Sequence, residues 1–202
     1  MKAILFDWGG VCCAEAEPFA SAALQRALKM TPDEITAEAQ GIHGNYYLGN
    51  HTRDSFWKAV INHFSLEESA EINPVALSNA YLQSYQIYPD VLELISQLKR
   101  NYTTGLLSNL TPEMKNHIQL KHDLEKYFHV QVYSCDSDVA SSKPDNKIFK
   151  ALLDKIKLKP EDCLFIDNTA GNVAAAEALG MRTIFFKNRA QFFSDIKTRL
   201  HL

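Results

Sequence analysis

The chain has 202 residues, a formal net charge of −3 and a hydrophobic content of 46%, which suits one packed domain with a modest insertion. It contains neither a run of basic residues nor an apolar stretch of membrane-spanning length, so nucleic acid and membranes are excluded as leading partners. The amino terminus does not follow a signal-peptide pattern, and we therefore expect a cytoplasmic protein.

The first predicted element is a buried strand over Ala3–Phe6, followed by Asp7 and then by Gly9 and Gly10. A continuous apolar run of this kind is typical of a central strand that is covered on both faces of a parallel sheet. Asp7 then lies at the carboxyl end of the strand, the edge where open parallel sheets bind ligands. The alternative is an ordinary turn residue, because Asp and Gly are common at strand ends.

Residues 16–86 predict an all-helical segment inserted after this strand. Apolar residues at helical spacing and a Thr31-Pro32 helix start support this interpretation. Helices are expected over 18–30, from residue 31 onward, and over 53–64 and 74–85. Residues 41–51 combine Gly, Asn, His and Tyr, which is typical of a loop.

From residue 87 onward, predicted helices and strands alternate, which indicates a parallel sheet with right-handed crossovers. The helices are expected over 89–98, 112–127, 148–156 and 173–179, and the strands over 103–107, 130–133, 163–166 and 183–186. The predicted fold class is therefore α/β, a three-layer doubly wound parallel sheet. Residues 1–15 and 87–202 form this core, and residues 16–86 form the helical insertion.

The four cysteines, Cys12, Cys13, Cys135 and Cys163, lack the spacing of a zinc site or a disulfide framework, so we expect reduced thiols. A redox role for the adjacent pair Cys12 and Cys13 is an alternative. Neighbouring residues on an extended strand point to opposite faces, however, which favours two small buried hydrophobic residues.

Polar side chains also follow the predicted strand over 103–107. Ser108 and Asn109 come directly after it, and Thr111-Pro112 begins the next helix. A hydroxyl group together with the free N–H groups of a helix start suits a bound phosphate. A simple helix cap is the alternative.

Two further segments carry charged groups at comparable places. Lys143 precedes a proline that begins a helix, where an ammonium group could hold carboxylates and a phosphate together. The alternative is a solvated surface lysine. Asp167 and Asn168 end the strand over 163–166, and oxygen ligands facing Asp7 there predict a Mg²⁺ site.

In order and spacing, the segments ILFDWGGV, GLLSN, SSKPDNKIF and FIDNTAGNVAAAEALGM resemble the four motifs of the haloacid dehalogenase superfamily of hydrolases, which are mostly phosphatases. The insertion resembles the cap that this family carries after its first motif. The Gly9-Gly10 pattern and the small helical cap look most like the branch that includes glucose-1-phosphate phosphatase. The resemblance implies a Rossmann-like core and Mg²⁺-dependent hydrolysis of a small phosphorylated metabolite, preferably a sugar phosphate.

The resemblance also assigns roles to individual residues. It implies that Asp7 attacks phosphorus to form an aspartyl-phosphate, a route that divides one difficult displacement into two. The residues expected to contact the phosphoryl group are Ser108, Asn109 and Lys143, and those expected to bind Mg²⁺ are Asp7, the carbonyl of Gly9, Asp167 and Asn168.

Two positions differ from the family pattern. Gly9 stands where a second aspartate usually acts as general acid and base, and Asn168 stands where an acidic metal ligand is usual. Loss of acid–base help costs about 100- to 10,000-fold in rate. These residues support one alternative, a weak or inactive phosphate-binding regulatory protein. A metal-free haloacid dehalogenase fits less well, because that branch typically has Tyr at the position of Gly9.

The cap segment over 41–51 is the expected source of substrate specificity. Its amide, phenol and imidazole groups suit a hydroxyl-rich substrate, and a polar surface turn is an equal alternative. The residues predicted to face the catalytic edge are His43, Asn45, Tyr46, Tyr47 and His51, with Tyr46 and His51 assigned to substrate binding. The sequence specifies neither the substrate nor the oligomeric state.

Overall fold

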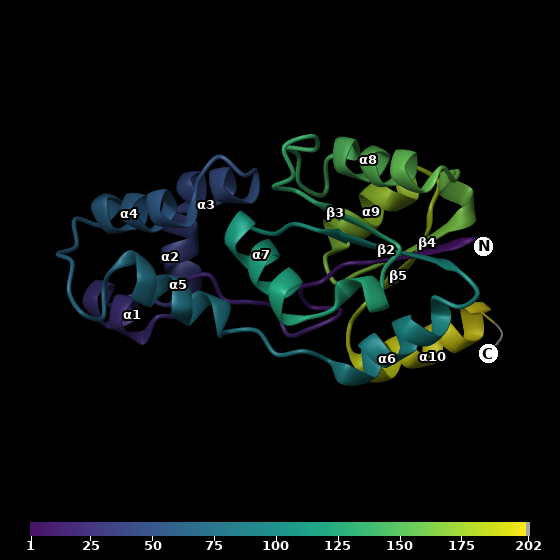
Figure 1. Ribbon diagram of the computed structural model, residues 1–202, viewed down its shortest axis with the longest axis horizontal. Coiled ribbons are helices and arrows are strands. Elements are labelled where there is room, and N and C mark those ends of the chain that lie inside the picture. The colour runs from purple at the N-terminus through teal and green to yellow at the C-terminus, as the bar shows by residue number, and fades with distance from the viewer. Residues whose placement is uncertain (201–202) are drawn as a thin grey trace.

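A computed structural model describes residues 1–200 as a parallel sheet covered by helices, with a helical unit at one end (Figure 1). The strands are β1 (Ala3–Phe6), β2 (Thr103–Ser108), β3 (Val130–Tyr133), β4 (Cys163–Asp167) and β5 (Arg182–Phe185). Their order is β3-β2-β1-β4-β5, and β1 pairs in parallel with both β2 and β4. The predicted α/β class and doubly wound parallel sheet are therefore confirmed, with the first strand at the centre. The predicted core range ran to residue 202, and residues 201 and 202 lie outside the described residues.

Side chains of β1 alternate between two apolar layers, because successive residues of a strand point to opposite faces. Ile4 and Phe6 belong to one layer and Ala3 and Leu5 to the other, and all four are fully buried. The first layer contains α6 (Pro89–Leu98), α7 (Pro112–Lys121) and α10 (Arg189–Leu200), and the second contains α8 (Asn146–Ile156) and α9 (Ala170–Ala178). A short 3-10 helix, η2 (Pro160–Asp162), leads into β4. Burial on both faces explains why the strand lacks polar residues.

Five helices between β1 and α6 form the helical unit, which we call the cap (Figure 1). They are α1 (Ala22–Leu28), α2 (Pro32–Glu38), α3 (Gln40–Tyr47), α4 (Arg53–His63) and α5 (Pro74–Leu82). The predicted helix start at Thr31 is present as a capping box with Glu34, in which each side chain accepts from the other residue's backbone N–H. None of the helices within residues 1–200 has the length and hydrophobicity needed to cross a membrane.

The loop predicted over 41–51 is wrong, because most of it forms α3. His43 and Tyr46 are buried on one face of this helix, together with the N-cap residue Ala39, at the three- and four-residue spacing of a helical stripe. Gly41 and Gly44 lie on its exposed surface. Packing of the buried face therefore outweighs the low helix propensity of glycine.

Three other local predictions were also inaccurate. The helix expected over 18–30 begins only at Ala22, with Ser21 as its N-cap. The helix expected over 112–127 ends at Lys121 and is followed by the 3-10 helix η1 (Leu124–Lys126). Cys12 and Cys13 lie in a turn rather than on an extended strand, because their N–H groups both donate to the carbonyl of Trp8. Their burial is as expected, and all four cysteines are free thiols.

The cap is attached to the core through a buried carboxylate, Glu113, in the first turn of α7. Glu113 accepts hydrogen bonds from the Tyr46 hydroxyl at 2.7 Å, from Trp57 Nε1 at 3.2 Å, and from the Ser78 hydroxyl. These donors belong to α3, α4 and α5 respectively. A buried carboxylate is costly unless it is hydrogen-bonded, so the core acid and the three cap helices depend on one another.

Candidate active site

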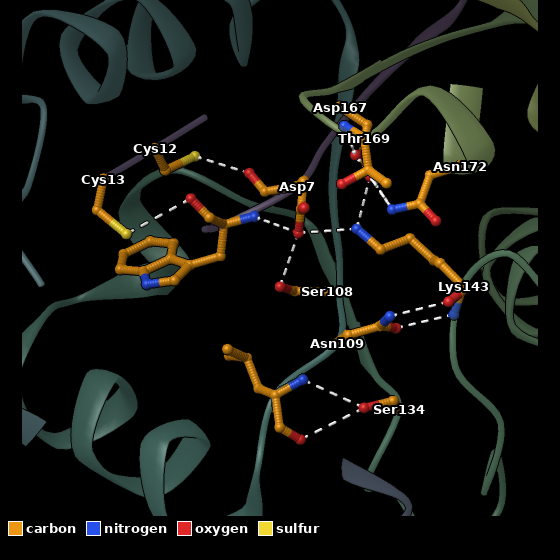
Figure 2. A network of polar contacts seen from close by, with 12 residues as sticks. Asp7, Cys12, Cys13, Ser108, Asn109, Ser134, Lys143, Asp167, Thr169 and Asn172 are labelled. Carbon is orange, nitrogen blue, oxygen red and sulfur yellow. Dashed lines mark hydrogen bonds and ion pairs between the residues drawn. The ribbon is translucent and has the colours of Figure 1, made fainter. Parts of the chain in front are cut away.

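Asp7 directly follows β1, and its carboxylate lies in a network of polar contacts at the carboxyl edge of the sheet (Figure 2). Its Oδ1 accepts hydrogen bonds from the N–H of Trp8 at 2.7 Å and the hydroxyl of Ser108 at 2.8 Å, and it lies 2.8 Å from Lys143 Nζ. Burial raises the pKa of Asp7 to about 6; Lys143 acts in the opposite direction, and Asp167 raises the pKa further. All three contacts are to the same carboxylate oxygen.

Lys143 connects the two acidic residues that the sequence places far apart. Its Nζ lies 2.8 Å from Asp7 Oδ1 and 2.7 Å from Asp167 Oδ2, and its side chain is only 1% exposed. Such burial is tolerable for an ammonium group because both neighbours carry the opposite charge. The arrangement brings together Asp7, Lys143 and Asp167, as the sequence predicted.

Asp167 is fully buried, and its other hydrogen bonds come from the segment that follows β4. Thr169 N–H donates to Oδ1 at 2.8 Å, and Asn172 Nδ2 lies 3.1 and 3.0 Å from the two carboxylate oxygens (Figure 2). Thr169 and Asn172 were not anticipated as site residues. Their contribution depends on how the start of α9 folds back on the end of β4, which a linear pattern does not reveal.

Asn109 lies at the end of β2 and contacts the backbone of Lys143 through both ends of its amide (Figure 2). The sequence predicted Asn109 as a substrate ligand. In the structure its amide instead holds the loop that carries Lys143.

The same segment is also connected to the cap. The N–H of Leu110 donates to Ser134 Oγ at 3.1 Å, and the Ser134 hydroxyl donates to the carbonyl oxygen of Tyr47 in the cap at 2.7 Å.

The oxygen donors expected for Mg²⁺ lie on neighbouring loops. Gly10 has a positive φ of 74°, and a Cβ built there would lie 2.1 Å from Asn168 Nδ2, so glycine leaves the space that the Asn168 amide occupies. Within residues 1–200, no three His, Cys, Asp or Glu side chains are grouped to hold a metal ion. Asp7 and Gly9 line one cavity, whereas Asn168 lines a different one together with Gly10. The donor types of Asp7, Asp167, the Gly9 carbonyl and Asn168 suit Mg²⁺, which prefers oxygen and commonly uses one or two carboxylates with water and substrate phosphate, and their assignment as ligands stays a prediction.

A cavity of about 290 Å³ opens beside Asp7, between the core and the cap. The cap contributes Gly44 and Tyr47, and the segment that leads into the cap contributes Glu15. The core residues lining it are Asp7, Gly9, Ser108, Asn109, Ser142, Lys143, Thr169 and Asn172.

Glu15 is a residue of this cavity that the sequence did not single out. It lies in an irregular linker with no periodic pattern, so only its place eight residues after Asp7 could have drawn notice. A Cβ built on Gly9 would lie 3.6 Å from Glu15 Cγ, which is an ordinary van der Waals contact. The Glu15 side chain thus lies next to the position where the family usually has an aspartate.

The cap residues predicted to bind substrate are only partly brought to the cavity. Tyr47 lines it, whereas Tyr46 is fully buried and donates to Glu113, and His51 lies 3.3 Å from the Ser55 hydroxyl. Asn45 donates to the Gly41 carbonyl within α3. The structure therefore does not place Tyr46 or His51 at the cavity. Helix α3 turns the successive side chains of Tyr46 and Tyr47 to different sides, and His51 lies beyond the end of this helix, beside the start of α4.

A family model for haloacid dehalogenase-like hydrolases matches residues 1–180. The chain belongs to this family. Rat bifunctional epoxide hydrolase 2 is 30% identical over 103 residues, and the match spans 49% of this chain but only 18% of that relative. A phosphorylated carbohydrates phosphatase from Thermotoga maritima is 30% identical over 98 residues, which are 48% of this chain and 44% of that protein.

A solved haloacid dehalogenase family structure has the same fold. It is an enzyme from Bacteroides thetaiotaomicron in complex with magnesium and inorganic phosphate, and it superposes with a TM-score of 0.81 at 21% identity. The match covers 96% of this chain and 98% of that one. The family model confirms the predicted superfamily, the solved structure agrees with its fold, and the sugar-phosphate branch stays a prediction.

Proposed function

We propose that this hydrolase is a Mg²⁺-dependent phosphatase that acts on a small phosphorylated metabolite through an aspartyl-phosphate. The observation that carries the proposal is the arrangement around Asp7. Three donors, including Lys143 and Ser108, converge on Oδ1. This leaves Oδ2 as the oxygen for attack, with the ammonium and the hydroxyl beside the incoming phosphoryl group.

In the first step Asp7 Oδ2 forms a bond to phosphorus while the bond from phosphorus to the leaving-group oxygen breaks. Lys143 and Ser108 offset the negative charge of the phosphoryl oxygens, without which a carboxylate would be a poor nucleophile towards an anion. In the second step water attacks phosphorus, the bond to Asp7 breaks, and phosphate is released.

Asp7, the Gly9 carbonyl, Asp167 and Asn168 are the residues that would hold Mg²⁺. When bound, the ion would neutralise part of the charge that develops on the transferred phosphoryl group. Because Asn168 offers a neutral oxygen, this donor set carries less negative charge than one with a third carboxylate. A bound Mg²⁺ would then keep more of its positive charge towards the phosphate, so Mg²⁺ and phosphate should strengthen each other's binding.

Glu15 is our candidate for the proton donor that Gly9 cannot supply. It lines the cavity with Asp7, and its side chain lies beside the position where an aspartate at residue 9 would project. As an acid it would protonate the departing oxygen, and as a carboxylate it would then accept a proton from the attacking water.

The Thermotoga maritima relative acts, by its name, on phosphorylated carbohydrates, and the Bacteroides thetaiotaomicron enzyme was crystallised with magnesium and phosphate. The first supports a phosphorylated sugar or a similar polar metabolite as the substrate, and the second supports binding of Mg²⁺ and phosphate on this fold. The cap over the cavity supports the same interpretation, because a cap can exclude water and select the leaving group.

The decisive experiment is a panel of phosphomonoesters assayed for phosphate release with Mg²⁺, with Asp7→Asn as the blank. We expect Mg²⁺-dependent turnover that Asp7→Asn abolishes while the fold is retained. Hydrolysis that survives in highly purified Asp7→Asn would rule out the aspartyl-phosphate route. Phosphate binding without release would favour the regulatory alternative, and metal-free halide release from a 2-haloacid would favour a dehalogenase.

A further inference from the structure

A second cavity, of about 330 Å³, adjoins the one that contains Asp7. Glu15 and Tyr47 line both cavities, so the second begins where the first meets the cap. Its other polar residues are Glu17, Asp33, Thr36 and His43. A phosphomonoester whose phosphate sits at Asp7 would direct a sufficiently long leaving group past Tyr47 into this space.

The second cavity carries negative charge without a balancing cation. Its lining includes Glu15, Glu17 and Asp33 but no lysine or arginine, and none of these three acids forms an ion pair within residues 1–200. Burial raises the pKa of Glu17, and the charges of Asp33 and Glu15 act in the same direction, whereas a hydrogen bond from Phe19 N–H opposes them. The two cavities therefore differ in charge, since the first has the ammonium of Lys143.

His43 adds an unpartnered polar group to the acidic cavity. Its side chain lines the cavity although the residue is only 8% exposed, and its buried Nε2 has no hydrogen-bond partner within residues 1–200. Burial lowers the pKa of His43 to about 4, so the imidazole is neutral at pH 7 and adds no positive charge. Its ring lies 4.7 Å from that of Tyr47, centroid to centroid, which gives the wall aromatic surface as well.

The ligand that this chemistry suits is an organic cation rather than a metal ion. No group of three His, Cys, Asp or Glu side chains in the described chain is arranged to hold a metal. A protonated amine, in contrast, needs only dispersed carboxylates, an acceptor nitrogen and an aromatic surface.

We propose that the acidic cavity binds a protonated amine on the leaving group, so that the substrate is an amino-sugar or amino-alcohol phosphate. This inference rests on the proposed phosphatase function, because it places the phosphate at Asp7 and the amine near Glu17 and Asp33. A leaving group that carries a second negative charge would be repelled by the same carboxylates.

The test compares substrates that differ only in the amine: glucosamine 6-phosphate against glucose 6-phosphate, and phosphoethanolamine against ethyl phosphate. We expect kcat/KM to be about tenfold higher for the amine-containing substrate of each pair, mostly because its KM is lower. In the double variant Glu17→Gln with Asp33→Asn, the ratio of kcat/KM between the two substrates of each pair should be close to one. Thermal melting of the double variant against the parent protein checks that the variant is folded.

Glu38→Gln is the matched control, because Glu38 lies on α2 with Asp33 but does not line the cavity. Equal kcat/KM within both pairs, or a preference that survives the double variant, would overturn the amine proposal while leaving the phosphatase intact. If no phosphomonoester is hydrolysed, the proposed function fails instead. Calorimetric binding of the two hexose phosphates to Asp7→Asn then decides the amine preference without turnover, since equal affinities would refute it.

Discussion

Asn109 and Lys143 exchange two hydrogen bonds across 34 positions of sequence: the Asn109 amide donates to the Lys143 carbonyl at 3.0 Å and accepts from the Lys143 N–H at 2.8 Å. The residue after β2 thereby fixes the backbone of the loop whose ammonium group lies between Asp7 and Asp167. The position of Lys143 is therefore set by its main chain as well as by its two charged partners.

We predict that Asn109→Ala lowers kcat/KM by about 100-fold, because a small misplacement of a catalytic group has an effect of this order. Asn109→Asp should be intermediate, since a carboxylate can accept from the Lys143 N–H but cannot donate to its carbonyl. Phosphate release measures the effect, and Asn116→Ala, on the exposed side of α7, is the control. If Asn109→Ala is as active as Asn116→Ala, the two hydrogen bonds do not position Lys143.

The sheet and the main site residues could be predicted because each leaves a local signal in the sequence. Ala3–Phe6 is uniformly apolar, and Asp7, Ser108 and Asp167 follow predicted strands, so parallel packing alone brings them to one edge. Lys143 was identified from a different local signal, its place before a predicted helix start.

The remaining features depend on contacts between distant segments. Glu113 appears in the sequence as an ordinary acid at a helix start, and only the docking of three cap helices makes it a buried acceptor. Glu15 lies in a linker without periodicity, and the aromatic face of α3 is obscured by Gly41 and Gly44. No single-segment pattern contains this information.

Glu113 provides a test of cap docking. Glu113→Ala removes the acceptor of three buried donors and should lower the free energy of unfolding by about 3 kcal/mol, as expected when buried polar groups lose their partners. Urea denaturation measures this change. Glu93→Ala, an exposed acid on α6, should alter stability by less than about 0.5 kcal/mol. Similar unfolding midpoints for the two variants would show that Glu113 does not hold the cap.

His43 should make stability depend on pH. Burial lowers its pKa in the folded protein to about 4, compared with the ordinary value of 6.5, so protonation favours the unfolded chain. This contribution to stability is complete above about pH 6.5 and is lost as the pH falls towards 4. His43→Gln should therefore show a shallower decline than the parent over that range in thermal or urea unfolding. Parallel profiles for the two proteins would contradict the burial of a neutral imidazole.

Asn168→Asp should tighten Mg²⁺ binding by about tenfold, because a charged oxygen replaces a neutral one of the same size beside a divalent cation. The space opposite Gly10 accommodates both side chains, so the fold should not change. Titration calorimetry with Mg²⁺ alone gives the affinity without any assay of turnover. An unchanged affinity would mean that residue 168 is not a metal ligand, and Asn172→Asp would then be the next variant to titrate.

The roles of Gly9 and Glu15 can be separated by the leaving group. If Glu15 protonates the departing oxygen, Glu15→Gln should reduce turnover of an alkyl or sugar phosphate by about 100-fold or more, and affect an activated aryl phosphate far less. The reason is that an oxygen that leaves readily does not need a proton. Glu38→Gln is the control, since Glu38 lines neither cavity.

Gly9→Asp should then restore turnover of the poor leaving group in the Glu15→Gln background. The structure favours this rescue, because a Cβ at residue 9 meets only Glu15 Cγ, at 3.6 Å, and the positive φ belongs to Gly10 rather than Gly9. An aspartate at residue 9 therefore meets neither a steric clash nor the left-handed backbone that disfavours other residues. Thermal melting verifies that each variant is folded. If Glu15→Gln slows both leaving groups equally and Gly9→Asp fails to rescue it, Glu15 is not the proton donor.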